Sequence, residues 1–216
     1  MNTTSDSCYI ECRELKFSYS NGLQIEFPDL CFQRGEHWLI TGSSGSGKTT
    51  LLHLMAGLLK PQTGKIRIGD HITSEMSNTA LDKFRGKEIG IVFQTSHFVQ
   101  SLSIGENLEL ARFLAKNSPD KPRVNNLLER LGLGDKISKK PHQLSIGEQQ
   151  RAAIARAMVN QPAVVLADEP TASLDDRNTK IMIELLQKEC AENGATLVIV
   201  THDQRIKNLI ENVVEL

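Results

Sequence analysis

The 216-residue sequence has no apolar run that approaches the roughly 18 residues a membrane-spanning helix needs. Residues 1–7 carry neither a basic nor an apolar segment, so we expect no secretory signal. An excess of one charge is also missing, because 25 Lys and Arg face 26 Asp and Glu and the formal net charge is −1. Without a global basic field we expect no nucleic-acid partner. The sequence therefore predicts a cytoplasmic protein that reaches a membrane only through a partner.

Cysteine is scarce, and its spacing fits no metal site. The four cysteines are Cys8, Cys12, Cys31 and Cys190. Cys8 and Cys12 have the wrong spacing for a zinc site and no neighbouring histidine ligand. In a cytosolic chain, thiols stay reduced and pack as small apolar side chains. We therefore expect reduced, mostly buried thiols.

A phosphate-binding loop is the strongest signal in the sequence. Residues 42–49 read GSSGSGKT and match G-x-x-x-x-G-K-[ST] at each fixed position, between a predicted strand at 36–41 and a predicted helix at 50–59. Glycines let backbone N–H groups approach phosphate oxygens, and the helix dipole favours an anion. Lys48 adds a point charge for the β- and γ-phosphates, and the Thr49 hydroxyl is placed to bind Mg²⁺. The predicted nucleotide-binding residues are Gly42, Ser43, Ser44, Gly45, Ser46, Gly47, Lys48, Thr49 and Thr50.

The hydrophobic periodicity predicts an α/β fold with an inserted helical block. Alternating strands, joined by a turn at 20–22, begin the chain, whereas the later strands are continuously apolar, as in a parallel sheet covered on both faces. Breakers at Pro119, Gly134 and Pro141 separate helical patterns in between. The predicted strands are 8–18, 23–33, 36–41, 65–69, 88–94, 163–169, 195–200 and 212–215, and the predicted helices are 50–59, 80–85, 103–116, 120–132, 147–159 and 176–193, with a short one before the last strand.

Polar residues follow four of the apolar strands at their carboxyl ends. In parallel sheets, ligands bind outside those ends, so we expect the four ends to converge on the nucleotide phosphates. The alternative interpretation is that the carboxylates merely open a loop and that a lone histidine lies on the surface. The polar ends are Thr41, Gln94, Asp168 with Glu169, and Thr201 with His202.

The chemistry of these side chains predicts their roles. Asp168 stands where a second Mg²⁺-orienting carboxylate belongs, beside Thr49. Glu169 is the predicted general base for an attacking water. His202 is predicted to donate a hydrogen bond to the γ-phosphate, and the Gln94 side-chain oxygen to reach Mg²⁺ or the water.

The chain resembles the ATP-binding subunit of ABC transporters. The matching motifs span nearly the whole chain in family order, and residues 144–150 separate this family from other P-loop NTPases. The resemblance implies a RecA-like parallel-sheet core with an N-terminal antiparallel β subdomain and an inserted α-helical subdomain. It divides a single 1–216 domain into a core of residues 8–94 and 160–216 and a helical subdomain of residues 95–159. The matching residues are Tyr19, 42–49, Gln94, 144–151, 164–170, 173–175 and His202.

The resemblance also implies a head-to-tail dimer around two ATP molecules with Mg²⁺. Tyr19 would stack on adenine, with simple packing as the alternative. Ser145 and Gly147 would begin a helix that faces the γ-phosphate bound to the other subunit, and Asp175 would cross the dimer interface. Two positions depart from the family pattern: Ile146 stands where glycine is usual, and Glu148 where glutamine is commoner. We expect these departures to affect closure of the dimer.

The amino-acid sequence between the motifs is similar to that of the group that includes lipoprotein-releasing, macrolide-exporting and cell-division ATPases. This resemblance implies an integral-membrane permease as partner, docked near residues 94–102, and a position on the inner face of the cell membrane. The apolar residues Phe98, Val99 and Leu102 either face that partner or belong to the core of the helical lobe. The leading hypothesis is a transport ATPase. The alternative is a regulatory or force-transmitting ATPase that moves no substrate.

Overall fold

The structure is a computed structural model that describes residues 8–20 and 22–216. The expectation for residues 1–7 and the central residue of the predicted 20–22 turn, Asn21, lie outside the described residues. Around that turn, the Gly22 backbone N–H donates to the Tyr19 carbonyl at 3.0 Å. Within the described part of the chain, no helix is long and apolar enough to cross a membrane.

A five-stranded parallel sheet forms the centre of the molecule. Its spatial order is β10-β4-β9-β8-β7, and each neighbouring pair is parallel. Strands β8 and β9 are buried along their whole length, as expected from their unbroken apolar sequences. The bounds are β4 (His37–Thr41), β7 (Ile89–Val92), β8 (Val164–Asp168), β9 (Thr196–Val200) and β10 (Asn212–Glu215).

An antiparallel sheet packs beside it, in the order β2-β1-β5-β6, with β3 also paired to β1. The predicted strand at 23–33 is wrong as one element, because it is interrupted between Glu26 and Leu30. Pro28 lies in the gap, and proline has no N–H to donate to a strand ladder. The bounds are β1 (Cys8–Ser18), β2 (Gln24–Glu26), β3 (Leu30–Gln33), β5 (Thr63–Ile68) and β6 (His71–Ile72).

The predicted helices are confirmed, with ends shifted by a few residues. Ser103 and Asp120 cap the helices that follow them by accepting hydrogen bonds from backbone N–H groups, as such residues do at helix starts. The helices are α1 (Lys48–Met55), α2 (Asn78–Glu88), α3 (Ile104–Leu114), α4 (Lys121–Arg130), α5 (Ile146–Met158) and α6 (Asp176–Glu192). Short 3₁₀ turns occur at Thr73–Glu75, Gly134–Lys136, Pro141–Gln143 and Gln204–Leu209.

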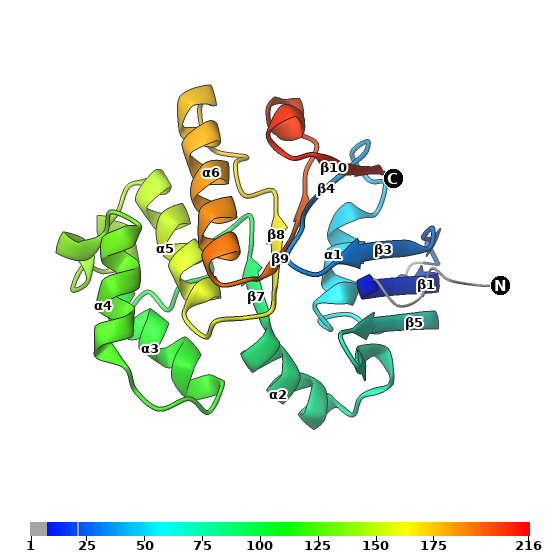
Figure 1. The fold of residues 1–216 in the computed structure, drawn as a ribbon, viewed down its shortest axis with the longest axis horizontal. Coiled ribbons are helices and arrows are strands. Elements are labelled where there is room, and N and C mark those ends of the chain that lie inside the picture. Colours follow the sequence, from blue (N-terminus) through cyan, green and yellow to red (C-terminus); the bar gives the residue numbers. More distant parts are fainter. Residues whose placement is uncertain (1–7, 21) are drawn as a thin grey trace.

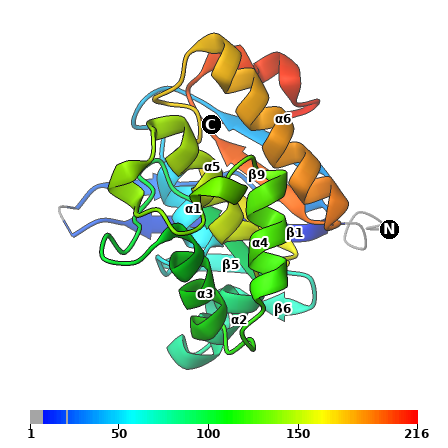
Figure 2. The ribbon, with the colours of Figure 1, turned by 90° about the vertical axis from the view of Figure 1, so that its left-hand side faces the viewer.

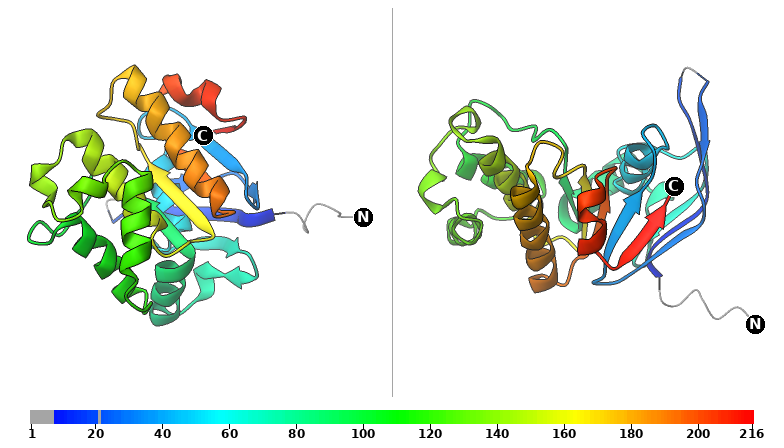
Figure 3. Two further views of the ribbon diagram at one scale, coloured as in Figure 1. Left: turned by 60° about the vertical axis from the view of Figure 1, so that its left-hand side comes forward. Right: turned by 90° about the horizontal axis from the view of Figure 1, so that it is seen from above.

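The elements form layers on the two faces of the parallel sheet (Figure 1). Helix α1 and the antiparallel sheet cover one face, while α5 and α6 cover the other. Helices α3 and α4 lie outside α5, so that α3, α4 and α5 make a lobe on one side of the molecule (Figures 2 and 3). The lobe is therefore joined to the sheet mainly through α5.

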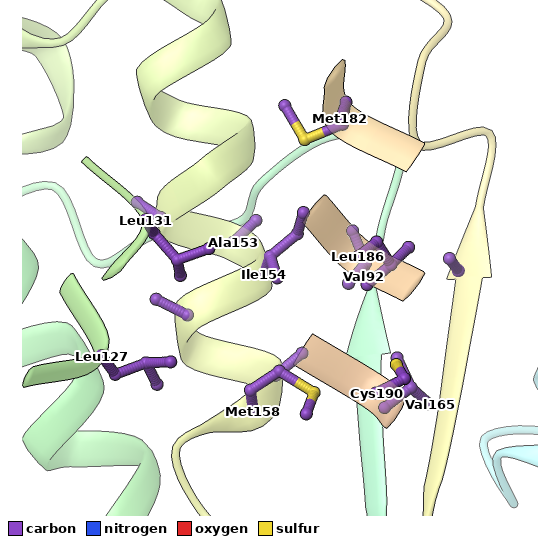
Figure 4. Packing of buried hydrophobic residues seen from close by; sticks show 14 of the residues in the cluster. Val92, Leu127, Leu131, Ala153, Ile154, Met158, Val165, Met182, Leu186 and Cys190 are labelled. Atoms are coloured by element: carbon purple, nitrogen blue, oxygen red, sulfur yellow. The ribbon is translucent and has the colours of Figure 1, made fainter. Parts of the chain in front are cut away.

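Apolar side chains of α5 connect the lobe to the sheet. Ile154 and Met158 point towards Leu186 and Cys190 of α6, next to Val92 of β7 (Figure 4). Backbone also meets backbone here, because a Cβ on Gly90 of β7 would lie 2.5 Å from the Ala157 carbonyl oxygen. The absence of a side chain at position 90 thus allows α5 to lie directly on β7.

The cysteines differ from the expectation. Cys8 and Cys31 form a disulfide, so the prediction that the thiols are reduced is wrong for this pair. Strands β1 and β3 are antiparallel neighbours and hold the two Cα atoms 5.2 Å apart, within the range a disulfide spans. Cys12 and Cys190 are free and buried, and burial raises the pKa of the Cys12 thiol to about 12.

Candidate functional site

The loop between β4 and α1 has the backbone that its glycines allow. Gly42, Gly45 and Gly47 have φ values of 153°, 82° and 95°, which other residues rarely adopt. At Gly42 a side chain is also excluded by space, since its Cβ would lie 2.5 Å from the Leu216 carbonyl oxygen. The Lys48 ammonium donates to the Gly42 and Ser43 carbonyls at 2.9 and 2.8 Å. The Lys48 side chain therefore lies across the same loop that is predicted to bind the phosphates.

A cavity of about 510 Å³ opens beside this loop. It combines the phosphate loop with side chains from the ends of β7, β8 and β9 and from the segment after β1. Leu23 and Ile25 were not predicted as site residues, because the alternation of residues 24–27 indicates a half-buried strand but not which cavity its side chains line. The lining residues are Tyr19, Leu23, Ile25, Ser44, Gly45, Gly47, Lys48, Thr49, Thr50, Gln94, Glu169 and His202. Gly42, Ser43 and Ser46 belong to the same loop but do not line the cavity.

Glu169 has an unusual backbone conformation at this site. Its φ is 45°, although it is not glycine, and its N–H donates to the Val200 carbonyl at 2.9 Å. Such a conformation costs roughly 1–3 kcal/mol and persists where the surroundings hold it. The carboxylate accepts hydrogen bonds from the Thr201 hydroxyl at 2.6 Å and the His202 N–H at 3.0 Å, and the His202 Nδ1 lies 2.6 Å away. The sequence predicts Glu169 as a base but gives no sign of this conformation.

Asp168 points to a different partner from its neighbour. Its Oδ1 accepts a hydrogen bond from the Thr49 hydroxyl at 3.0 Å. Burial raises the pKa of the Asp168 carboxyl, while the Thr49 hydroxyl, His53 and Lys48 act in the opposite direction. The two adjacent carboxylates thus have different partners, Asp168 on α1 and Glu169 at the end of β9.

The oxygen atoms of Thr49, Asp168 and Gln94 suit Mg²⁺. Among the described residues no group of three or more His, Cys, Asp and Glu is arranged to hold a metal. Mg²⁺ does not need such a group, because it keeps several waters and binds one or two protein oxygens together with substrate phosphates. The donor set therefore fits Mg²⁺ bound with a nucleotide.

Tyr19 lines the same cavity as Glu169. Its hydroxyl is 2.5 Å from the Thr50 Oγ1, and its ring packs edge-on against Phe17 with centroids 4.9 Å apart. The Tyr19 side chain is still 38% exposed. Both packing and contact with a bound base are compatible with these contacts, so stacking on adenine stays a prediction.

Besides Gly42, Ser43, Ser46 and Asp168, three further predicted site residues do not line the cavity. Ser145 and Asp175 are exposed N-caps of α5 and α6, and Gly147 follows in the first turn of α5. Ser145 donates from its hydroxyl and from its backbone N–H to Glu148 Oε2, both at 2.8 Å. The Ile146 side chain is 60% exposed. The two departures from the family pattern therefore give a capping box and a solvent-facing side chain, and neither disrupts the helix start.

The segment after Gln94 divides between the two interpretations offered for it. Phe98 is 7% exposed and belongs to the core of the lobe, whereas Val99 is 42% exposed. Leu102 is partly buried. Of these three, Val99 is therefore the most available to face a partner.

Comparison with known proteins gives the same family throughout. Residues 26–172 match the family described as ABC transporter. The chain is 38% identical over 210 residues to the lipoprotein-releasing system ATP-binding protein LolD of Idiomarina loihiensis, covering 94% of this chain and 92% of that one. It is 40% identical over 214 residues to the macrolide export ATP-binding/permease protein MacB of Nitrosomonas europaea, of which it spans 32%.

Solved structures with the same fold include an ATP-binding cassette and a part of an ABC transporter complex. A dimeric post-hydrolysis state of the cassette MJ0796, bound to ADP and Pi, has a TM-score of 0.87 and 34% identity, covering 96% of this chain and 94% of that one. CbiO1 from Clostridium perfringens, part of the ABC transporter complex cbiONQ, has a TM-score of 0.86 and 31% identity, covering 97% and 85%. The predicted fold class is confirmed by these likenesses.

Proposed function

Starting from the premise that this chain belongs to the ABC transporter family, as an ATP-binding and ATP-hydrolysing motor subunit, we propose that two copies close head to tail around two Mg-ATP and drive a membrane permease. The observation that carries this proposal is the division of the predicted site. The cavity holds Lys48, Gln94, Glu169 and His202, whereas Ser145 lies exposed outside it. A second copy of the chain is the simplest source of an α5 N-terminus, with its Ser145, for this cavity.

In this proposal the residues of one cavity have separate tasks. Lys48 and the loop N–H groups bind the triphosphate, and Thr49, Asp168 and Gln94 would hold Mg²⁺. When bound, Mg²⁺ neutralises phosphate charge. Glu169 orients the water and takes its proton, which is worth about 10²–10⁴ in rate for a general base.

His202 supports Glu169 in the proposed mechanism. Its backbone N–H and ring lie against the carboxylate, and both side chains line the cavity. The remaining His202 nitrogen is available to a phosphate oxygen, because the side chain is 66% exposed. Hydrolysis then removes the contact that the γ-phosphate makes with the partner's α5, and the dimer reopens.

For the permease we propose docking beside residues 94–102 and across the surface formed by α2 and α3. Phe113 and Leu114 at the end of α3 are 73% and 70% exposed, an unusual pair of apolar neighbours on a surface. Next to them is a cavity of about 370 Å³. Lysines dominate its polar lining, so a permease segment with apolar and acidic side chains would fit. The lining residues are His71, Lys83, Phe84, Lys87, Glu88, Leu114, Ala115 and Lys116.

ATP-dependent dimerisation tests the proposal. A Glu169→Gln variant should bind ATP without completing hydrolysis, so size-exclusion chromatography with Mg-ATP should show a dimer that dissociates with ADP. Adding Ser145→Arg should abolish this dimer while leaving ATP binding intact. A chain that hydrolyses ATP but stays monomeric in every nucleotide state would contradict the proposal that two copies close around ATP.

Co-purification from membranes identifies the partner and separates the two roles. A transporter would have a permease whose cargo stimulates ATP hydrolysis. A regulatory or force-transmitting subunit, the alternative function, would have a partner that stimulates hydrolysis with no substrate moved. Phe113→Asp should release the partner in either case, whereas Phe113→Leu should retain it.

A further inference from the structure

Gln94 belongs to a segment that crosses from the sheet to the helical lobe. Residues 93–98 leave β7 and lead towards α3, without regular secondary structure. At the sheet side, the Phe93 ring lies between His53 of α1 and His97, with centroid distances of 6.3 and 5.4 Å. The position of the start of the segment is therefore determined by α1 and β7.

A side chain of α5, Arg156, contacts the lobe side of the segment, where Phe98 also packs in the lobe core. The Arg156 Nη1 donates to the His97 carbonyl at 2.9 Å, and the guanidinium carbon lies 4.8 Å from the centre of the Phe98 ring. His97 has a φ of 45°, a conformation that non-glycine residues adopt rarely and that needs support from its surroundings. Arg156 supplies two such contacts to adjacent residues.

Arg156 is itself in a defined position. The neighbouring residue Ala157 lies against Gly90 of β7 through its carbonyl, and Met158 packs in the core. Arg156 is partly buried, and this burial lowers the pKa of its guanidinium. The far end of the Gln94 segment is therefore attached to the same helix that begins at Ser145.

We propose that Arg156 is a positioning residue for Gln94. By holding His97 and Phe98, it sets where the short segment can place the Gln94 side chain relative to the cavity. It also makes any displacement of α5 move this segment. This inference rests on the proposed role of Gln94 at the metal or the attacking water. It goes beyond that role by assigning the control of Gln94 to a residue outside the cavity.

The test compares Arg156→Ala and Arg156→Lys with the wild-type chain, and Arg34→Ala as the matched control. Arg34, in the turn after β3, also lies over an aromatic ring, at 5.2 Å from the centroid of Tyr9 in β1. Arg156→Ala should lower kcat about ten- to a hundredfold, because small misplacements of a catalytic group have effects of that size. The KM for ATP should change less than about twofold, since the phosphate loop is untouched. Arg156→Lys should restore part of kcat, and Arg34→Ala should leave both constants unchanged.

Amide hydrogen exchange without nucleotide gives a readout that does not depend on hydrolysis. Exchange in residues 94–98 should speed up in Arg156→Ala, with α5 unchanged, and should be partly slowed again in Arg156→Lys. Unchanged exchange in residues 94–98, or an unchanged kcat, would overturn the inference. So would a parallel loss of ATP binding and of protection throughout α5, because Arg156 would then serve stability alone. Absence of ATP hydrolysis in the wild-type chain would instead count against the proposed function, and the exchange result would still decide the inference.

Discussion

The Glu169 carboxylate lies 2.6 Å from the Nδ1 of His202, and the same carboxylate also receives the His202 backbone N–H at 3.0 Å. The two residues follow different strands, β8 and β9, and meet because those strands are parallel neighbours. The contact orients the proposed base. The Glu169 carboxylate also accepts a hydrogen bond from the Thr201 hydroxyl, so loss of the His202 ring does not release the carboxylate completely.

Replacing His202 is therefore expected to cost less than replacing Glu169. His202→Ala should lower kcat about 10- to 100-fold, whereas Glu169→Gln should lower it about 10²- to 10⁴-fold, the range for losing a general base. Steady-state phosphate release under saturating Mg-ATP measures both. Equal effects from the two variants would mean that the residues act as one unit, and an unaffected Glu169→Gln would remove the general-base role.

The Asp168 pKa predicts a gain in stability when its charge is removed. Burial raises that pKa in the folded chain, so the folded state binds the proton more tightly than the unfolded state does. The resulting stabilisation is present below the unfolded pKa of about 3.9 and is lost as pH rises through the folded value. At neutral pH without nucleotide, Asp168→Asn should thus raise Tm.

The same variant should lose Mg-dependent hydrolysis, because the amide is a weaker partner for Mg²⁺. Thermal unfolding followed by circular dichroism at neutral pH and near pH 4 separates the charge effect from packing. The gain in Tm should shrink at the lower pH. A constant gain across that range would show that the carboxylate charge is not its cause.

The close contact between β7 and α5 predicts that a substitution at Gly90 strongly destabilises the fold. Gly90→Ala should destabilise the fold by about 1–3 kcal/mol, since the new methyl group would lie 2.5 Å from the Ala157 carbonyl and force the helix away. Gly134→Ala is the matched control, because its Cβ would meet the flexible Cγ of Glu129 at 2.9 Å. Urea unfolding measures the difference. Similar values for both variants would mean that the backbone contact is not tight.

The disulfide between Cys8 and Cys31 predicts a count of thiols. Denatured chain without reductant should expose two reactive thiols, and four after reduction. Closing a loop across a sequence separation of 23 is worth about 3 kcal/mol in the chain-entropy estimate, so Cys31→Ser should lower stability by that order. Cys190→Ser, at a free buried thiol, is the comparison. Four thiols before reduction would contradict the bond.

Glu148 should weaken the proposed dimer relative to a glutamine. The Ser145 backbone N–H and hydroxyl lower the pKa of Glu148, so it is ionised at neutral pH at the α5 start. In the proposed dimer that carboxylate would approach a phosphate. Glu148→Gln keeps the cap and removes the charge, and ATP-induced dimerisation should tighten about three- to tenfold. Analytical ultracentrifugation checks this, and weaker dimerisation of the variant would contradict the repulsion.

The sequence alone determined the features that depend on neighbouring residues. The phosphate loop and its flanking strand and helix follow from a continuous pattern of residue types, and the apolar strands and capped helices follow from periodicity. The parallel sheet could be inferred because unbroken apolar strands separated by helices have few other arrangements. Polar residues at the strand ends then pointed to one edge, where the structure brings Gln94, Glu169 and His202 into one cavity.

Only the tertiary structure decided the contacts between residues distant in sequence. The Cys8–Cys31 bond depends on the register of β1 and β3, and the strained backbone of Glu169 depends on partners at the end of β9. The attachment of His97 to Arg156 depends on how closely α5 lies on β7. Local patterns carry no distance information for such pairs, because packing of the whole core sets which side chains meet.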